Sequence, residues 1–133
     1  NAQNETKVLK EAVCEIVEIT KISFTHNDAE LAKSVEPLEQ TIDRLKKSIK
    51  NNHVIRLREG ECTMEHGFIL SDLLTNYERI SDHCSNIAVA LIESAHNSFK
   101  THEYLNSVKY GNSEFNELYN EFSVKYNTSL LNV

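Results

Sequence analysis

Apolar residues recur at steps of three and four along most of the chain, which predicts amphipathic helices. The first repeat, in residues 5–24, comprises Val8, Leu9, Ala12, Ile16 and Ile19. The second, in residues 29–57, comprises Leu31, Val35, Leu38, Ile42, Leu45 and Ile49. Pro37 interrupts the second repeat. Because the proline ring clashes with the carbonyl group one turn earlier, we expect a kink or a new helix start there.

The second half of the chain continues the pattern. Residues 63–97 carry a core-facing stripe made of Ile69, Leu73, Tyr77, Ile80, Cys84, Ile87 and Leu91. Residues 98–112 are less periodic and end at the turn signal Gly111-Asn112-Ser113. A shorter helix is predicted over residues 113–126, with Phe115, Leu118, Tyr119, Phe122 and Tyr126 on one face. We interpret this aromatic stripe as core and not as a ligand site.

Turn signals separate these segments. Asn27, with Glu30 three residues later, resembles a capping box and predicts the start of the second helix. Gly60 is predicted to follow the last residue of that helix. The whole chain holds only 3 Gly and 1 Pro, which favours long helices with few connections. The predicted fold is all-α: an up-down antiparallel bundle of three long helices plus a shorter C-terminal helix.

The length of 133 residues fits a single domain. We place the helical bundle at residues 5–126. Residues 1–4 do not begin with Met, and we interpret them as a cloning scar or a linker. On this interpretation, the domain was cut from a longer protein. Residues 127–133 are predicted to form a flexible tail.

Composition excludes several classes of function. The net charge is −6 and no basic run is longer than Lys46-Lys47, so no nucleic-acid partner is predicted. No stretch of ~18 apolar residues exists, so no membrane span is expected in this chain. Cys14, Cys62 and Cys84 are odd in number and form no CxxC, which favours buried free thiols in a reducing cytosol over a disulfide framework.

No catalytic residue is predicted, and the chain is not expected to be an enzyme. The sequence contains no GxGxxG, GxxxxGK[ST], GxSxG or HExxH motif. Cys84 lies on an apolar stripe, which argues against a nucleophile, although a Cys–His pair that meets only in the fold stays open. A di-iron core is disfavoured because Glu93–His96 is the single Glu-x-x-His match.

Two pairs of carboxylates have the same spacing, Glu39 with Asp43 and Glu78 with Asp82. Like charges four residues apart destabilise a helix by about 0.2–0.5 kcal/mol. The spacing predicts that Glu78 and Asp82 point away from the apolar stripe, and that Glu39 and Asp43 lie on the flank of theirs. Such pairs are either solvated surface or a surface metal site, for which the spacing leaves Mg²⁺, Mn²⁺, Ca²⁺, iron and zinc open.

Two stretches, "VEPLEQTIDRL" and "REGECTMEHGFILSDLLTNYERISDHCSNIA", resemble the PhoU domain family. More narrowly, they look like the C-terminal PhoU-like domain of bacterial sodium/phosphate cotransporter-family proteins. The resemblance covers residues 29–93, and "NYERISDHCSNIA" is its most specific part. It implies a helical bundle whose E(D)xxxD motifs hold surface iron or zinc. By position, the implied metal ligands are Glu39, Asp43, Glu78 and Asp82.

The resemblance also implies a role in regulating phosphate uptake and signalling. On this basis we expect a non-catalytic regulatory domain of a sodium/phosphate cotransporter-like protein, on the cytoplasmic face of the bacterial membrane. Its partner would be the transporter portion of the same polypeptide. The alternative is a stand-alone cytoplasmic adaptor in phosphate-starvation signalling, which binds a phosphate transporter or a sensor kinase. Full PhoU proteins carry two tandem bundles, so a homodimer is one way to complete the metal arrangement.

Overall fold

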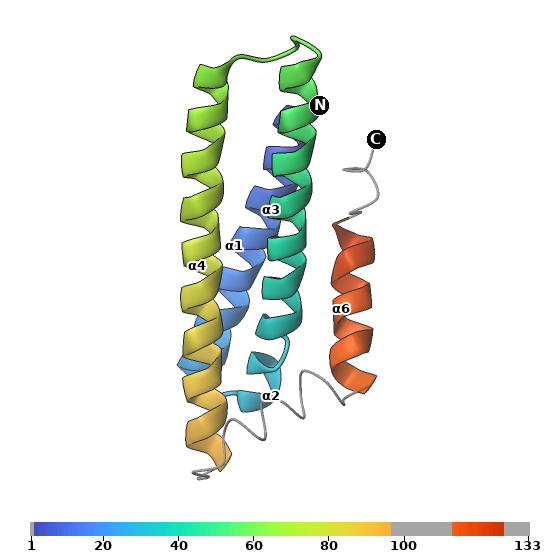
Figure 1. Ribbon diagram of the computed structural model, residues 1–133. Coiled ribbons are helices and arrows are strands. Elements are labelled where there is room, and N and C mark those ends of the chain that lie inside the picture. Colours follow the sequence, from blue (N-terminus) through green and yellow to red (C-terminus); the bar gives the residue numbers. More distant parts are fainter. Residues whose placement is uncertain (1, 97–112, 127–133) are drawn as a thin grey trace.

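The computed structural model describes residues 2–96 and 113–126, and every regular element in these ranges is a helix (Figure 1). The helices are α1 (Ala2–His26), α2 (Ala29–Ala32), α3 (Val35–Arg58), α4 (Met64–His96) and α6 (Ser113–Lys125). The chain runs one way in α1 and α4 and the opposite way in α3 and α6 (Figure 1). The prediction of an all-α, up-down bundle is confirmed.

The core lies between α1, α3 and α4, each of which packs against the other two, while α6 packs on α3. The stripes predicted for the first two helical segments supply it: Leu9, Ala12 and Ile16 of α1 are buried, as are five of the six residues predicted for the second. The aromatic stripe of α6 is core as predicted, with Phe115, Phe122 and Tyr126 buried.

The junction between α1 and α2 differs from the predicted capping box. Asn27 has a φ of 52° and follows the last residue of α1 in the left-handed conformation that asparagine tolerates. The amide of the next residue, Asp28, donates to the carbonyl of Ser23 and closes the end of α1. Asp28, not Asn27, is the N-cap of α2, because its carboxylate accepts from the amide of Leu31 at 2.9 Å.

The second predicted helix is divided in two, and the expectation of a new helix start near Pro37 is confirmed. Pro37 lies in the first turn of α3, where proline is tolerated because the first amides of a helix have no partner within it, so no hydrogen bond is lost. At the other end, Gly60 has a φ of 75° and follows the helix as predicted. The amides of Gly60 and Glu61 donate to the carbonyls of Leu57 and Arg56, a Schellman arrangement.

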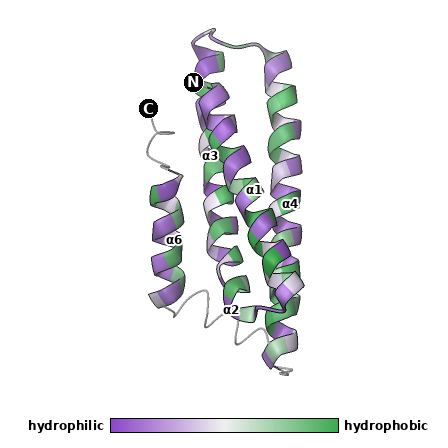
Figure 2. Ribbon diagram, turned by 180° about the vertical axis from the view of Figure 1, so that it is seen from behind, coloured by the Kyte–Doolittle hydropathy of each residue, from purple (hydrophilic) through white to green (hydrophobic). Residues whose placement is uncertain are grey.

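The apolar stripe predicted for α4 is partly wrong. Cys84 and Leu91 are buried, but Ile69, Ile80 and Ile87 are exposed, Ile69 to 69%. The buried face of α4 is rotated and consists of Leu74, Ser81, Cys84, Ala88, Leu91 and Ile92. The small side chains of Ser81 and Ala88 let α4 pack closely, so the core runs along them and leaves larger isoleucines outside. Hydrophobic and hydrophilic residues alternate along α4 (Figure 2).

The outer boundaries also differ in detail. α1 begins at Ala2, so residues 2–4, assigned to a scar or linker, continue the helix. The predicted aperiodic stretch of residues 98–112 and the predicted flexible tail of residues 127–133 lie outside the described residues.

Candidate functional site

The four carboxylates predicted as metal ligands lie on α3 and α4, which are adjacent in the bundle (Figure 1). Glu39 and Asp43 are half-buried on α3, and Asp82 is exposed on α4. The prediction that Glu78 points away from the bundle is wrong. Because the core face of α4 is rotated, the side chain of Glu78 lies on the flank that faces α3 and is 40% exposed.

A lysine, Lys46 of α3, stands between the two helices at this point. Its ammonium forms an ion pair with the Glu78 carboxylate and lies 3.8 Å from an oxygen of Asp43. Lys47 pairs with the other oxygen of Asp43 at 2.6 Å. About two turns before Asp43 on α3, Glu36 accepts a hydrogen bond from the Ser85 hydroxyl of α4 at 2.7 Å. The Lys46–Glu78 and Ser85–Glu36 contacts join α3 to α4 along a polar seam, and the two contacts of Asp43 lie beside them within α3.

The charges of the polar seam shift the pKa of Lys47. The hydrogen bond that Lys47 donates to Asp43 raises the pKa of Lys47 above its usual 10.5, and the charges of Asp43, Glu39 and Glu78 add to this effect. Carboxylates of both helices therefore raise the pKa of the same lysine. The like-charge spacing is tolerated because Lys46 and Lys47 offset it.

As arranged, the seam does not fit a metal ion. Within the described parts of the chain, no three His, Cys, Asp or Glu side chains gather closely enough to hold a cation. The place between Asp43 and Glu78 is taken by the Lys46 ammonium. Metal binding by Glu39, Asp43, Glu78 and Asp82 stays a prediction, and it would require Lys46 to leave its two partners.

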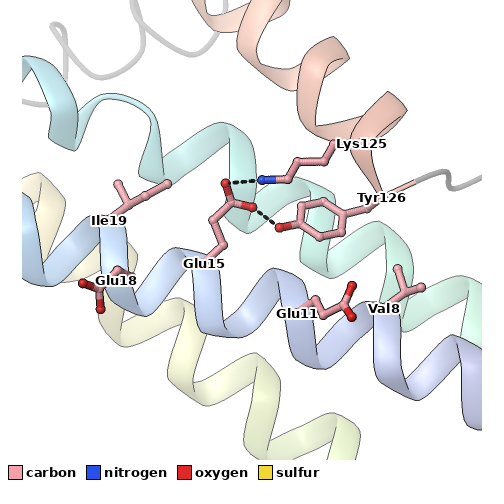
Figure 3. A pocket seen from close by; sticks show the side chains of 7 residues that line it. All are labelled: Val8, Glu11, Glu15, Glu18, Ile19, Lys125 and Tyr126. Carbon is pink, nitrogen blue, oxygen red and sulfur yellow. Dashed lines mark hydrogen bonds and ion pairs between the residues drawn. The ribbon is translucent and has the colours of Figure 1, made fainter.

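A second polar site, which the sequence did not reveal, joins α1 to the end of α6 (Figure 3). Glu15 accepts from the Lys125 ammonium at 2.7 Å and from the Tyr126 hydroxyl. A groove of about 810 Å³ runs beside this contact, lined by Val8, Glu11, Glu15, Glu18, Ile19, Lys125 and Tyr126. The three glutamates follow α1 at helical spacing, but the contact of Glu15 with residues 110 and 111 positions later could be found only in the fold.

Cysteine placement corrects another expectation. All three thiols are free, as predicted, yet only Cys84 is buried; Cys14 is exposed and Cys62 is half-buried. The Sγ atom of Cys62 lies 3.6 Å from Nδ1 of His53, so one Cys–His pair does form in the fold. Burial raises the pKa of the Cys84 thiol, which keeps it protonated and unreactive near neutral pH.

An apolar face lies on the side of the bundle where α1 and α4 run in the same direction. We define it by Val17 and Phe24, two turns apart on α1, and Ile80 and Ile87, two turns apart on α4, all exposed. Phe24 is 68% exposed. Phe24 and Ile87 border a groove of about 400 Å³ that continues along Ala90 and Ser94.

Comparison with known families decides the identity of the fold. The PhoU domain family matches residues 7–91, which is more than half of the chain. The chain belongs to the PhoU family. The match includes all four candidate carboxylates and the whole apolar face, and it ends before α6.

One curated PhoU relative illustrates the likeness. The phosphate-specific transport system accessory protein PhoU homolog 1 of Thermotoga maritima is 28% identical over 109 residues. The alignment covers 80% of this chain but only 46% of the relative, so the chain spans about half the length of that protein. No solved structure matches this PhoU domain. None of its described helices is long and apolar enough to cross a membrane.

Proposed function

We propose that this PhoU domain is a non-catalytic regulatory domain of phosphate transport, and that it acts by binding a transporter protein. Family membership supports the phosphate context, since the Thermotoga relative is named as an accessory protein of a phosphate-specific transport system. The observation that carries the binding role is the apolar face. Exposed apolar patches of this kind mark protein interaction sites.

The physical driving force for docking is burial of that face. Val17, Phe24 and Ile87 stand out from a helix surface that is otherwise rich in charge. Removing apolar surface from water contributes about 25 cal/mol per Å². A partner that covers the four residues of the apolar face would gain this free energy, and aromatic residues such as Phe24 are the usual anchors of such contacts.

The molecular context has two forms. In the first, the domain sits on the cytoplasmic face of the membrane as part of a sodium/phosphate cotransporter-like polypeptide and binds its own transporter portion. The resemblance of "VEPLEQTIDRL" and "REGECTMEHGFILSDLLTNYERISDHCSNIA", read together, to that subgroup supports it. In the second, it is a stand-alone cytoplasmic adaptor that binds a separate transporter or a sensor kinase, and the accessory role named for the relative supports this form at least as well.

Gene context separates the two forms. Under the cotransporter form, the coding sequence that precedes residue 1 encodes several apolar spans of ~20 residues each. A coding sequence that starts near residue 1 would remove this form and leave the adaptor.

The docking role is tested with Phe24→Asp and Ile87→Asp, each of which places a charge on the apolar face. Val124→Asp is the matched control, because Val124 is an exposed apolar residue on α6, away from that face. We expect the first two variants to lose capture of the purified transporter while the control retains it. Equal capture by all three would contradict the proposal. Loss of a concentration-dependent dimer, with transporter capture intact, would assign the face to a second copy of the chain.

A further inference from the structure

A small pocket lies between α3 and α4, beyond the polar seam and towards the loop that joins the two helices. Its volume is about 260 Å³. Val54, Leu70 and Leu74 make up its apolar lining, and its polar lining comes from both helices: Lys46, Lys50, His53, Ser71, Thr75 and Glu78. Small-molecule sites commonly combine an apolar floor with a few converging polar groups in this way.

The charges in this pocket are unevenly distributed. At one end the Lys46 ammonium is neutralised by Glu78 and Asp43. Lys50, one turn further along α3, forms no ion pair or hydrogen bond with any residue that the structure describes. The end of the pocket beside Lys50 is therefore positive, although the chain as a whole carries a net charge of −6.

His53 is held in place at this positive end. Its Nδ1 lies 3.6 Å from the Cys62 thiol, which leaves Nε2 as the ring nitrogen that faces Gly67. A Cβ atom at Gly67 would come within 2.7 Å of that Nε2. The missing side chain at Gly67 therefore makes room for the imidazole edge in the pocket wall.

Two residues of α4, Ser71 and Thr75, contribute hydroxyl groups to the pocket lining. Thr75 donates its proton to the carbonyl of Ser71 at 2.9 Å, so its hydroxyl is not available as a donor. The Ser71 hydroxyl is one turn away on the same face. Lys50 and Ser71 thus offer an ammonium and an O–H from two helices, and the imidazole of His53 lines the pocket with them.

We propose that this pocket binds a phosphate group, either as inorganic phosphate or as a phosphate ester. A phosphate group carries its oxygens in a tetrahedral arrangement, so it can accept at once from the Lys50 ammonium on one helix and the Ser71 hydroxyl on the other. Lysine is a common phosphate binder, and hydrogen bonds to a charged acceptor are about twice as strong as neutral ones. The pocket lies on the side of α4 opposite the apolar face, so the inference does not rest on the docking role.

The test is a titration of the full chain, labelled with ¹⁵N, with sodium phosphate and separately with phosphoserine. Sodium chloride at matched ionic strength is the reference. We expect saturable shifts at the amides of Gly67 and Ser71 with one or both phosphate compounds and none with chloride. Stronger binding of inorganic phosphate identifies the free ion as the ligand, and stronger binding of phosphoserine identifies an ester.

Variants make the assignment specific. Lys50→Ala should weaken binding by about tenfold or more, because a charge-assisted hydrogen bond is lost. Lys10→Ala, which removes an exposed lysine of α1, should leave it unchanged. The same spectra show that each variant is folded, and Ser71→Ala gives a second, uncharged change in the pocket. Absence of saturable shifts, or equal weakening by Lys50→Ala and Lys10→Ala, would overturn the proposal.

Discussion

Glu5 of α1 accepts two parallel hydrogen bonds from the guanidinium group of Arg56 of α3. The two N–O distances are 2.9 and 2.8 Å, and the amide of Asn52 donates to the same carboxylate at 3.1 Å. The side chain of Glu5 is only 7% exposed. The pair joins the first turns of α1 to the last turn of α3, where few apolar side chains hold the two helices together.

Removing one partner of this pair should destabilise the bundle strongly. Glu5→Ala leaves the half-buried Arg56 guanidinium without its counter-ion and removes two charge-assisted hydrogen bonds, which should cost about 1.5–3 kcal/mol. Urea denaturation followed by circular dichroism measures the loss. Glu11→Ala, an exposed glutamate on the same helix, should change stability little. A similar small effect of Glu5→Ala would show that the pair contributes nothing.

The pH dependence of the same contact has a definite sign. The hydrogen bonds that Arg56 donates to Glu5 raise the pKa of Arg56 above its usual value. A cation with a raised pKa in the folded state contributes stability below its unfolded pKa and loses it only as the pH rises beyond that value. The contribution of Arg56 is therefore constant through neutral and mildly alkaline solution.

Cys84, in contrast, is expected to make the free energy of unfolding depend on pH in alkaline solution. Burial between α1 and α4 raises the pKa of this thiol above its usual 9.0. The folded state then holds a proton that the unfolded state loses, so the free energy of unfolding falls as the pH rises above about 9. We expect Cys84→Ala to show a smaller decline between pH 8 and 10.5 than the parent chain, whatever its stability at pH 7. Identical slopes would contradict this assignment.

Attachment of α6 depends on its last residues. Tyr126→Phe keeps a buried ring but removes the hydroxyl that donates to Glu15, which should cost about 1–3 kcal/mol because the carboxylate oxygen loses a donor. Amide hydrogen exchange should become faster in residues 113–125 and stay unchanged in α1 and α3. Tyr119→Phe is the matched control, since Tyr119 stacks on Phe115 through its ring. Equal protection of α6 in both variants would argue against the anchor.

The metal prediction can be tested through Lys46. Lys46→Met keeps the length of the side chain but removes the ammonium that competes for Asp43 and Glu78. We expect this variant to retain more iron, zinc or manganese than the parent chain in elemental analysis after incubation with each ion. The parent and a variant with alanine at Glu39, Asp43, Glu78 and Asp82 are measured beside it. Equal metal in all three samples would remove the carboxylates as ligands.

Periodicity predicted the fold well because most of the core consists of large aliphatic residues at regular steps. On α1 and α3 the stripe that includes Ile16 and Leu45 is the buried face. On α4 the same reasoning selected isoleucines, whereas packing selected Ser81 and Ala88, whose small size a hydrophobicity pattern does not register. The core face of α4 is therefore rotated from its predicted position, and for the same reason the predicted direction of Glu78 was wrong.

The contacts of the candidate site were harder to predict from the sequence than the fold, for a related reason. Spacing showed that Glu78 and Asp82 are neighbours, but it contained no information about Lys46, which is 32 positions away from Glu78 in the chain and reaches it only across the helix interface. The contacts of His53 with Cys62 and Gly67 likewise depend on how the α3–α4 hairpin closes. Contacts between helices are decided by packing, so sequence spacing within one helix cannot reveal them.

The junction of α1 and α2 has a mechanical consequence. Asn27 completes the end of α1 and Asp28 begins α2, so no residue is left over between the two caps. Neither residue can shift without breaking a cap, and α2 in turn contacts α4. The corner therefore contains no residue free of a cap that could serve as a hinge. We expect a partner that displaces Phe24, three residues before it, to move α1 and α2 together against α4.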